Sequence, residues 1–327
     1  MKKIFTMIRA NDWWEFKFPP MLAVGYMIIL NTHRNIVDKS SLLIVALIAI
    51  IIGAIYVSLI NDATDVDEDA KAGKRNQMAA YSTVQQIALI LLPLVGAGVI
   101  VFYFLRPFTV PNFFYFGSYL CFTLYSVPPF RFKKRGLSGI IVDALGSQVF
   151  PTLFIALLCY QSIGEEIKIW SLIFMGIWLF CFGVRGILWH QLADKENDKI
   201  SGLNTVVQNF SDAQLSKLGI GIVTIEIIAF VAYILFNQLY LVIPGLVVYF
   251  IYNRLLLKKF YVVQIYINPN VPQYRIFLFE YYQVFFPVSI LIIGAFYNPI
   301  NTIVLLLHLF LFPSNTLQIL KKLRASF

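Results

Sequence analysis

Long apolar runs follow one another along almost the whole chain of 327 residues and constrain its fold more than any other feature. A helix of about 20 apolar residues crosses the roughly 30 Å hydrocarbon layer of a membrane. Only 13% of the residues are charged, against about 25% in a soluble domain. The sequence therefore predicts an all-α, polytopic membrane protein, a bundle of nine or ten transmembrane helices around a central cavity. The predicted spans are 19–34, 41–60, 84–105, 110–127, 138–160, 168–190, 217–237, 239–253 and 279–297, with a weaker tenth run at 299–312.

Lysine and arginine residues are divided unevenly between the loops that separate these runs. With the N-terminus in the cytoplasm, 21 of the 26 basic residues lie on the cytoplasmic side, four lie on the opposite side, and Arg185 lies within a run. Positive charge favours the cytoplasmic side, so the distribution predicts a multi-pass protein of the cell (inner) membrane. The net charge of +9 then indicates contact with anionic membrane lipids and no nucleic-acid partner.

An acidic segment occurs twice, each time after a long apolar run. The first segment reads N-D-A-T-D-V-D-E-D-A-K-A-G and ends at Gly73, and the second reads D-K-E-N-D-K-I-S-G and ends at Gly202. Two Asp residues and one Gly recur at a constant offset of 129 positions. The recurrence indicates one domain over residues 1–327 with an internal pseudo-repeat, about 9–80 and 138–209. The matched pairs are Asp65 and Asp194, Asp69 and Asp198, and Gly73 and Gly202.

The carboxylates of each segment fall on one side if the segment is helical. At about 100° per residue, Asp62, Asp65 and Asp69 lie within an arc of about 60°, and Asp67 lies on the other side. The second segment repeats the pattern, with Glu196 pointing away. Clustered carboxylates repel one another, and Mg²⁺ is a cation whose preference for oxygen ligands suits them. We therefore predict a site for two Mg²⁺ ions, with Mn²⁺ as a substitute, at Asp62, Asp65, Asp69, Asp194 and Asp198.

A basic segment, Y-S-V-P-P-F-R-F-K-K-R-G, ends the fourth apolar run and extends from residue 125 to residue 136. By the topology above, its charges face the acidic segments from the same side of the membrane. A diphosphate substrate needs cationic partners beside the metal-binding carboxylates. We therefore predict that Arg131, Lys133 and Arg75 bind a diphosphate. The same charges are also explained by topology alone. Four residues close to these motifs are predicted to line a substrate cavity, namely Arg9, Tyr125, His190 and Gln191.

These motifs resemble those of the UbiA superfamily of intramembrane prenyltransferases, over nearly the full length of the chain. The first segment matches the pattern N-D-x-x-D-x-x-x-D and the second D-x-x-x-D-x-x-x-G-x-x-T. The Y-S-x-P-P-x-R-x-K stretch looks like the loop of chlorophyll-synthase-like and archaeal lipid-forming members. One departure is Asn76 after Arg75, where the family often has proline. The matching residues of the two Asp motifs are Asn61, Asp62, Asp65, Asp69, Asp194, Asp198, Gly202 and Thr205.

The resemblance implies a nine-helix fold around a central cavity, with Mg²⁺ joining both motifs to a prenyl diphosphate that Asn61 helps to bind. It implies an Mg-dependent enzyme of isoprenoid biosynthesis, which transfers an isoprenyl group from an allylic prenyl diphosphate to a lipophilic or aromatic acceptor. Metal-assisted ionisation of the diphosphate would start the reaction. The catalytic carboxylates would be Asp65, Asp69, Asp194 and Asp198.

Two other functions remain open at this point. A terpene cyclase of the same superfamily would use the same ionisation without an acceptor. A transporter also combines repeats with intramembrane carboxylates, but its sites usually lie near the midplane, whereas these motifs lie at one face. The sequence leaves the prenyl chain length, the acceptor and the oligomeric state open. Within the spans, we expect Asp143 and Arg185 to form an ion pair, and Glu226 has no evident partner.

Overall fold

The computed structural model describes residues 7–200, 202, 205–257 and 276–326. These residues form helices and no β-strand, which confirms the predicted all-α fold. Among them, five helices are long and apolar enough to cross a membrane, or six if a pair bent by 86° counts as one span. The predicted number of nine or ten spans is not confirmed, because the other runs form helices that are shorter or carry more polar residues.

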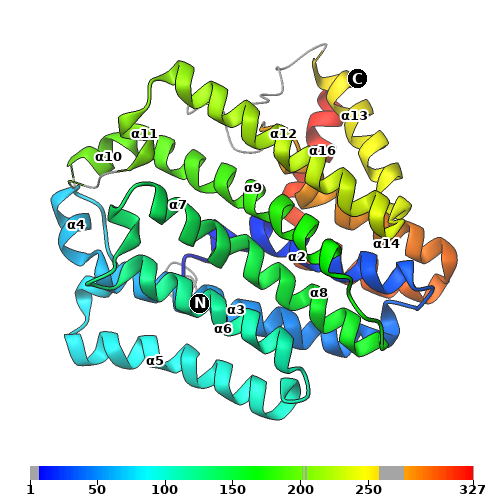
Figure 1. Cartoon of the computed structure of the whole chain (residues 1–327), viewed down its shortest axis with the longest axis horizontal. Coiled ribbons are helices and arrows are strands. Elements are labelled where there is room, and N and C mark those ends of the chain that lie inside the picture. Colours follow the sequence, from blue (N-terminus) through cyan, green and yellow to red (C-terminus); the bar gives the residue numbers. More distant parts are fainter. Residues whose placement is uncertain (1–6, 201, 203–204, 258–275, 327) are drawn as a thin grey trace.

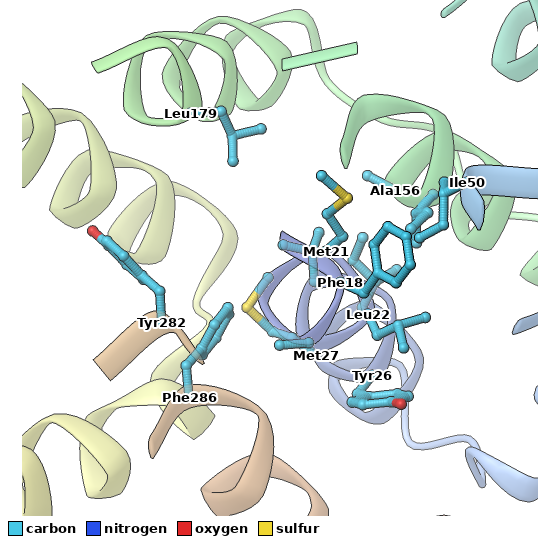
Figure 2. Packing of buried hydrophobic residues seen from close by; sticks show 14 of the residues in the cluster. Phe18, Met21, Leu22, Tyr26, Met27, Ile50, Ala156, Leu179, Tyr282 and Phe286 are labelled. Carbon is cyan, nitrogen blue, oxygen red and sulfur yellow. The ribbon is translucent and has the colours of Figure 1, made fainter. Parts of the chain in front are cut away.

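Helix α2 (Ala10–Asn31) lies at the centre of the bundle, between α8 (Phe150–Ile163) and α14 (Phe286–Tyr297) (Figure 1). A helix that is apolar on all sides is stable in a protein when it is buried. Met27 and Ile29 of α2 are accordingly fully buried. Figure 2 shows how side chains of α2 pack among residues from the surrounding helices, which together form the main hydrophobic core.

The remaining long helices pack around this centre. They are α3 (Ser40–Thr64), α5 (Thr83–Ile100), α6 (Thr109–Ser126), α7 (Leu137–Ala144), α9 (Ile169–Ala193), α12 (Asp212–Asn237), α13 (Ile243–Leu257), α15 (Thr302–Leu311) and α16 (Pro313–Ser326). α3 packs against α5 and α6, and α9 packs against α7 and α12. α5 lies at the outer edge of the bundle, where only 11% of its apolar window is buried (Figure 1). Most of the α5 surface therefore faces lipid.

Two of the helices begin with a π-helical turn. The turn η5 (Leu145–Val149) joins α7 to α8, and η8 (Tyr281–Phe285) leads into α14. In each case a proline follows two positions later, Pro151 or Pro287. Proline has no N–H to donate to the preceding turn, and its ring clashes with the carbonyl four residues before it. The π-helical turn accommodates this local mismatch without ending the helix.

Two parts of the chain, 129 residues apart, fold into helices of equal length. α3 and α9 each have 25 residues, and each is followed by a helix of six residues, α4 (Val66–Lys71) or α10 (Lys195–Ile200). Gly73 and Gly202 then adopt left-handed conformations, with φ of 67° and 69°, which glycine accepts at no steric cost. α4 and α10 lie at the same end of the bundle (Figure 1). Both acidic segments therefore lie at one end of the protein.

A fully buried ion pair joins α9 to α12. Arg185 Nε and Nη2 donate to the two carboxylate oxygens of Glu226, at 2.7 Å each, and both side chains are 0% exposed. Tyr282 donates a further hydrogen bond to Glu226 at 3.0 Å. The predicted ion pair between Asp143 and Arg185 is wrong, and Asp143 instead accepts a hydrogen bond from Ser147 at 3.4 Å. α12 packs along α9 and brings Glu226 opposite Arg185, and the bidentate pair satisfies both charges in an apolar interior.

Candidate active site

Both acidic segments contain a break between two helices, at matching Asp residues. Asp65 separates α3 from α4 with φ −107° and ψ 3°, and Asp194 separates α9 from α10 with φ −98° and ψ 6°. The Asp65 amide donates to the carbonyl of Asp62 at 3.3 Å, which tightens the turn at this point. The prediction of a continuous helix, from which the angles between the carboxylates were calculated, is therefore wrong. Asp67 and Glu196 are nevertheless exposed, in agreement with the expectation that they point away.

The basic segment folds over the first acidic segment. Arg131 Nη2 lies 3.3 Å from Asp65 Oδ1 and 3.0 Å from Glu68 Oε1. Lys133 also contacts the Asp65 carboxylate, and Lys134 Nζ lies 2.5 Å from Glu68 Oε1. The side chains of Asp65 and Glu68 are only 26% and 11% exposed, so these ion pairs are partly shielded from water. The sequence analysis missed Glu68, although its position three residues after Asp65 indicates the same side of a helix.

Further contacts hold the rest of the first segment. Arg9 Nη1 lies 3.6 Å from Asp62 Oδ1, and Asn76 Nδ2 donates to Asp69 Oδ2 at 2.8 Å. Arg75, predicted to bind diphosphate, is exposed and makes no hydrogen bond or ion pair with the described part of the chain. Every predicted metal-binding carboxylate of this segment therefore has a cationic or amide partner within the protein.

The second acidic segment is more open. Lys74 Nζ lies 3.0 Å from Asp194 Oδ1 and links the two segments, although the side chains are 39% and 48% exposed. Burial, together with the neighbouring Asp194 charge, raises the pKa of Asp198 to about 6, against the opposing effect of Lys74. His190 is exposed, and Gln191 is buried with no hydrogen-bond partner for its Oε1 among the described residues. The sequence analysis missed Lys74 and predicted a diphosphate contact for its neighbour Arg75 instead.

The donor set of the two segments suits a divalent metal. Within the described residues, no group of three or more His, Cys, Asp or Glu side chains is arranged as a metal site by itself. Mg²⁺ does not require such a group, because it commonly binds one or two carboxylates and fills its other positions with water and substrate phosphate oxygens. The pair of like charges at Asp194 and Asp198 is the kind of arrangement that a bound cation stabilises. The residues present therefore fit a Mg²⁺ site that is completed by a phosphorylated ligand.

A cavity of about 90 Å³ lies inside the bundle among α2, α3, α6 and η5. This volume is smaller than that of most small-molecule sites, about 300–1,000 Å³. Its wall is mostly apolar and includes Trp13, Phe18 and Phe122. Tyr115 and Tyr119 also line it, and their hydroxyl groups lie 2.8 Å apart. Because Tyr115 also donates to a backbone carbonyl of α3 at 3.0 Å, its polar group is satisfied by the protein.

One wall of the cavity lies near the first acidic segment. Ser58 lines the cavity and lies about one helical turn before Asp62 on α3. Asn61, on the same turn as Asp62, accepts a hydrogen bond from Ser126 of α6. The acidic motif and the wall of the cavity therefore lie about one helical turn apart on α3.

The four residues predicted to line a substrate cavity are not among those that line this one. Two of them lie close to it, since Arg9 contacts Asp62 and the Tyr125 ring centroid lies 6.1 Å from that of Phe122. The sequence analysis missed Lys17, which does line the cavity. The sequence signal for Lys17 was a single charged residue at the edge of the first apolar run. The four predicted residues are Arg9, Tyr125, His190 and Gln191.

Solved structures share this arrangement of helices. A UbiA homolog from Archaeoglobus fulgidus bound to GPP and Mg²⁺ is 18% identical, with a TM-score of 0.62, over 90% of this chain and 99% of that chain. The homolog from the same organism bound to DMAPP and Mg²⁺ is 16% identical, with a TM-score of 0.61 and the same coverage. Another structure of a UbiA homolog from this organism is 18% identical, with a TM-score of 0.61 and the same coverage. At this level of identity, the similarity shows a common fold.

Sequence comparison gives the family. No curated protein matches the chain. The sequence profile of the UbiA prenyltransferase family matches residues 18–243, which include both acidic segments, the basic segment and most of the residues around the cavity. The chain belongs to the UbiA prenyltransferase family.

Proposed function

We propose that this protein is a membrane prenyltransferase that transfers an isoprenyl group from an allylic prenyl diphosphate to a lipophilic or aromatic acceptor. The observation that carries the proposal is the basic segment, packed on an acidic segment that lies about one helical turn from an apolar cavity. An allylic diphosphate has the two matching parts, a polyanionic head and an apolar tail. The A. fulgidus homologs bound to GPP or DMAPP with Mg²⁺ support the same class of substrate.

The charged residues would bind and release the diphosphate. The five Asp residues of the two segments would hold two Mg²⁺ ions, for which Mn²⁺ would substitute. Arg131 and Lys133 would then exchange their contacts with Asp65 for contacts with phosphate oxygens, with Asn61 and Arg75 as further ligands. When bound, the metal supplies Lewis-acid charge that stabilises the leaving diphosphate. The protein cations add electrostatic stabilisation in a site that is partly shielded from water.

The cavity would protect the reactive carbon. Loss of diphosphate leaves an allylic cation, which water captures unless it is excluded. The aromatic wall, with Trp13, Phe18 and Phe122, excludes water and presents ring faces to a cation. A desolvated cation–π contact contributes about 2 kcal/mol. The acceptor then forms a bond to the cationic carbon and loses a proton.

We also propose the orientation in the membrane. The end of the bundle with α4 and α10 would face the cytoplasm, because most basic residues of the loops lie on that side in the predicted topology. The protein would be an integral protein of the cell (inner) membrane. Its diphosphate substrate, which is too polar to cross the bilayer, would enter from the aqueous side, and its prenyl tail would enter the cavity.

The proposal is tested with the purified protein in lipid nanodiscs and geranyl diphosphate as the substrate. We expect release of pyrophosphate with Mg²⁺, its loss in excess EDTA, and its recovery with added Mg²⁺ or Mn²⁺. Mass spectrometry with a panel of acceptors identifies the prenylated product. Undiminished turnover in EDTA, or no pyrophosphate release under any of these conditions, would contradict the proposal. Cyclic hydrocarbons formed without an acceptor would identify a terpene cyclase instead.

A further inference from the structure

A second group of polar residues lies in the cavity wall, apart from the acidic and basic segments. Lys17 of α2 and Ser147 of η5 both line the cavity. Ser147 Oγ donates to Asp143 Oδ2 at 3.4 Å, and the charges of Asp143 and Lys17 attract each other. A carboxylate and an ammonium group within an apolar helical bundle are costly to bury, so they are functional candidates wherever they meet a cavity.

The π-helical turn η5 positions the side chains of this polar group. Asp143 is on α7, and Ser147 is on the π-helical turn that follows it. Such turns occur frequently at functional sites, because the extra residue changes the direction of the side chains around it. In this protein, Gly146 and Ser147 line the cavity, and the bond from Ser147 holds the carboxylate of Asp143 beside it.

Asp143 also lies near the end of the cavity where the diphosphate would react. The charges of Asp143 and of Asp198 in the second acidic segment both disfavour ionisation of the Tyr125 hydroxyl group, so Tyr125 lies near both carboxylates. The Tyr125 ring packs at 6.1 Å from Phe122, which lines the cavity. Asp143 therefore shares the neighbour Tyr125 with the second acidic segment, and its hydrogen-bond partner Ser147 lines the cavity. In the proposed function, the bond between the prenyl carbon and the acceptor would form in this region.

An unused hydrogen-bonding group lies in the same wall. Ser118 of α6 lines the cavity, and its buried Oγ has no hydrogen-bond partner among the described residues. Buried polar groups are nearly always hydrogen-bonded, so an unpartnered one in a cavity wall is available to a polar ligand. Two walls of the cavity, α6 and η5, thus present polar atoms within a surface that is otherwise apolar.

We propose that Lys17 and Asp143 bind the hydroxyl group of the acceptor and that Asp143 is the general base of the transfer. This inference rests on the proposed prenyltransferase function. A hydroxyl group is matched by this pair, because its oxygen accepts a hydrogen bond from the Lys17 ammonium and its hydrogen is donated to the Asp143 carboxylate. The acceptor class is therefore an alcohol or a phenol with an apolar remainder.

The chemical step balances as a substitution at oxygen. The bond between the allylic carbon and the diphosphate oxygen breaks, and its electron pair leaves with the diphosphate. The acceptor oxygen forms a bond to that carbon, while its O–H bond breaks and the proton passes to Asp143. The carboxylic acid so formed returns its proton to water when the products leave. A general base in this position contributes about 10²–10⁴-fold to the rate.

The test separates transfer from ionisation of the diphosphate. The protein in nanodiscs receives geranyl diphosphate and Mg²⁺, alone and with octanol, 4-hydroxybenzoate or an alkylglycerol phosphate. We expect Asp143→Asn to lower kcat for formation of the O-prenylated product by about 10²–10⁴-fold. Pyrophosphate release without an acceptor should fall at least about tenfold less than transfer does, because ionisation depends mainly on the acidic and basic segments. Asp143→Glu should restore part of the transfer rate, since it keeps the carboxylate.

Lys17→Met should raise KM for the acceptor about tenfold with kcat nearly unchanged, as expected for a lost charge-assisted hydrogen bond. Asp212→Asn, an exposed carboxylate on α12, is the matched control and should leave both reactions unchanged. Transfer at the normal rate in Asp143→Asn would overturn the inference. Prenylation on carbon, or no product from any hydroxyl compound while wild type releases pyrophosphate, would also overturn it. If wild type releases no pyrophosphate at all, the proposed function itself fails.

Discussion

The two acidic segments share a sequence pattern but differ in their surroundings. Three cations of the basic segment pack on the first, where the Glu68 side chain is 11% exposed. In the second, the Asp194 side chain is 48% exposed, and Lys74 is its ion-pair partner. The first segment also carries two carboxylates, Asp62 and Glu68, at positions where the second has Gln191 and Asn197. The described contacts therefore tie the first segment to the basic segment, whereas the second segment is more exposed.

We propose that residues about 9–80 and 138–209 form a structural pseudo-repeat that has been adapted in this unequal way. The equal lengths of α3 and α9, and of α4 and α10, support it. Just beyond these bounds, two capping boxes occur at the same offset, Ser82 with Gln85 at the start of α5 and Ser211 with Gln214 at the start of α12. The difference in charged contacts shows that the first of the two acidic segments packs against the basic segment.

The largest expected effect is the same in both halves. Asp65→Asn and Asp194→Asn should each lower pyrophosphate release from geranyl diphosphate by about 10²–10³-fold, because each removes charge that holds the metal against the leaving group. Asp69→Asn and Asp198→Asn should behave alike. Steady-state assays at saturating Mg²⁺ measure the loss, with protein yield and detergent stability as controls. A nearly normal Asp194→Asn enzyme would mean that only the first segment holds metal.

The next largest effect is expected at the basic segment, which packs on the first acidic segment alone. Arg131→Met and Lys133→Met should each raise KM for geranyl diphosphate by roughly tenfold to a hundredfold, the value of a lost hydrogen bond to a charged group. Arg135→Met is the matched control, since Arg135 is exposed and donates to the carbonyl of Pro129. Both binding variants should still insert, because many other bases set the topology. Normal KM values would mean that the basic segment sets the membrane topology and does not bind the diphosphate.

A smaller effect distinguishes the second half by pH. The pKa of Asp198 is raised to about 6, so the native protein holds this proton more tightly than the unfolded chain does. Without metal, the stability that comes from the protonated form is present at low pH and is lost as the pH rises from about 4 to about 6. In EDTA, Asp198→Asn should therefore be more stable than wild type at pH 7, by up to about 1 kcal/mol after solvent screening.

Thermal unfolding in EDTA at pH 5 and pH 7 measures this difference. The advantage of the variant should be smaller at pH 5, where wild-type Asp198 is mostly protonated. An advantage of equal size at both pH values would show that Asp198 does not titrate in this range. Added Mg²⁺ should stabilise wild type more than the variant, because it binds the ionised carboxylate.

The smallest effects are expected at two exposed carboxylates that the halves have in common. Asp67→Asn and Glu196→Gln should each stay within about tenfold of wild-type activity, because each removes a solvated charge. The same pyrophosphate assay applies to both. If either variant matches the loss seen for Asp65→Asn, the metal ligands of that segment must be assigned again.

The sequence predicts the helical fold and the family well, because apolar runs and spaced carboxylates are local features. It also predicts the match between the two acidic segments. It does not predict the break at Asp65 and Asp194, since a pattern of i and i+4 carboxylates fits both a continuous helix and two helices joined by a turn. The count of spans depends on which polar residues face the interior, and periodicity alone does not show this.

Contacts between distant helices were the least predictable part. The partner of Arg185 depends on how α9, α7 and α12 are rotated about their axes, and a small rotation decides between Asp143 and Glu226. Lys17 was not recognised for the same reason, because its contact with the cavity arises from the packing of α2 at the centre of the bundle. Residues of this kind become candidates only when the helices are seen together.

During synthesis, α9 enters the membrane before α12, and Arg185 precedes Glu226 by 41 residues. An arginine at the centre of an inserting helix costs about 2.5–3.5 kcal/mol. The nascent chain bears this cost until the helix with its partner has also been inserted. A polypeptide that stops between the two helices leaves this arginine without its carboxylate partner. The buried pair thus stabilises the inserted α9 only after α12 has been translated.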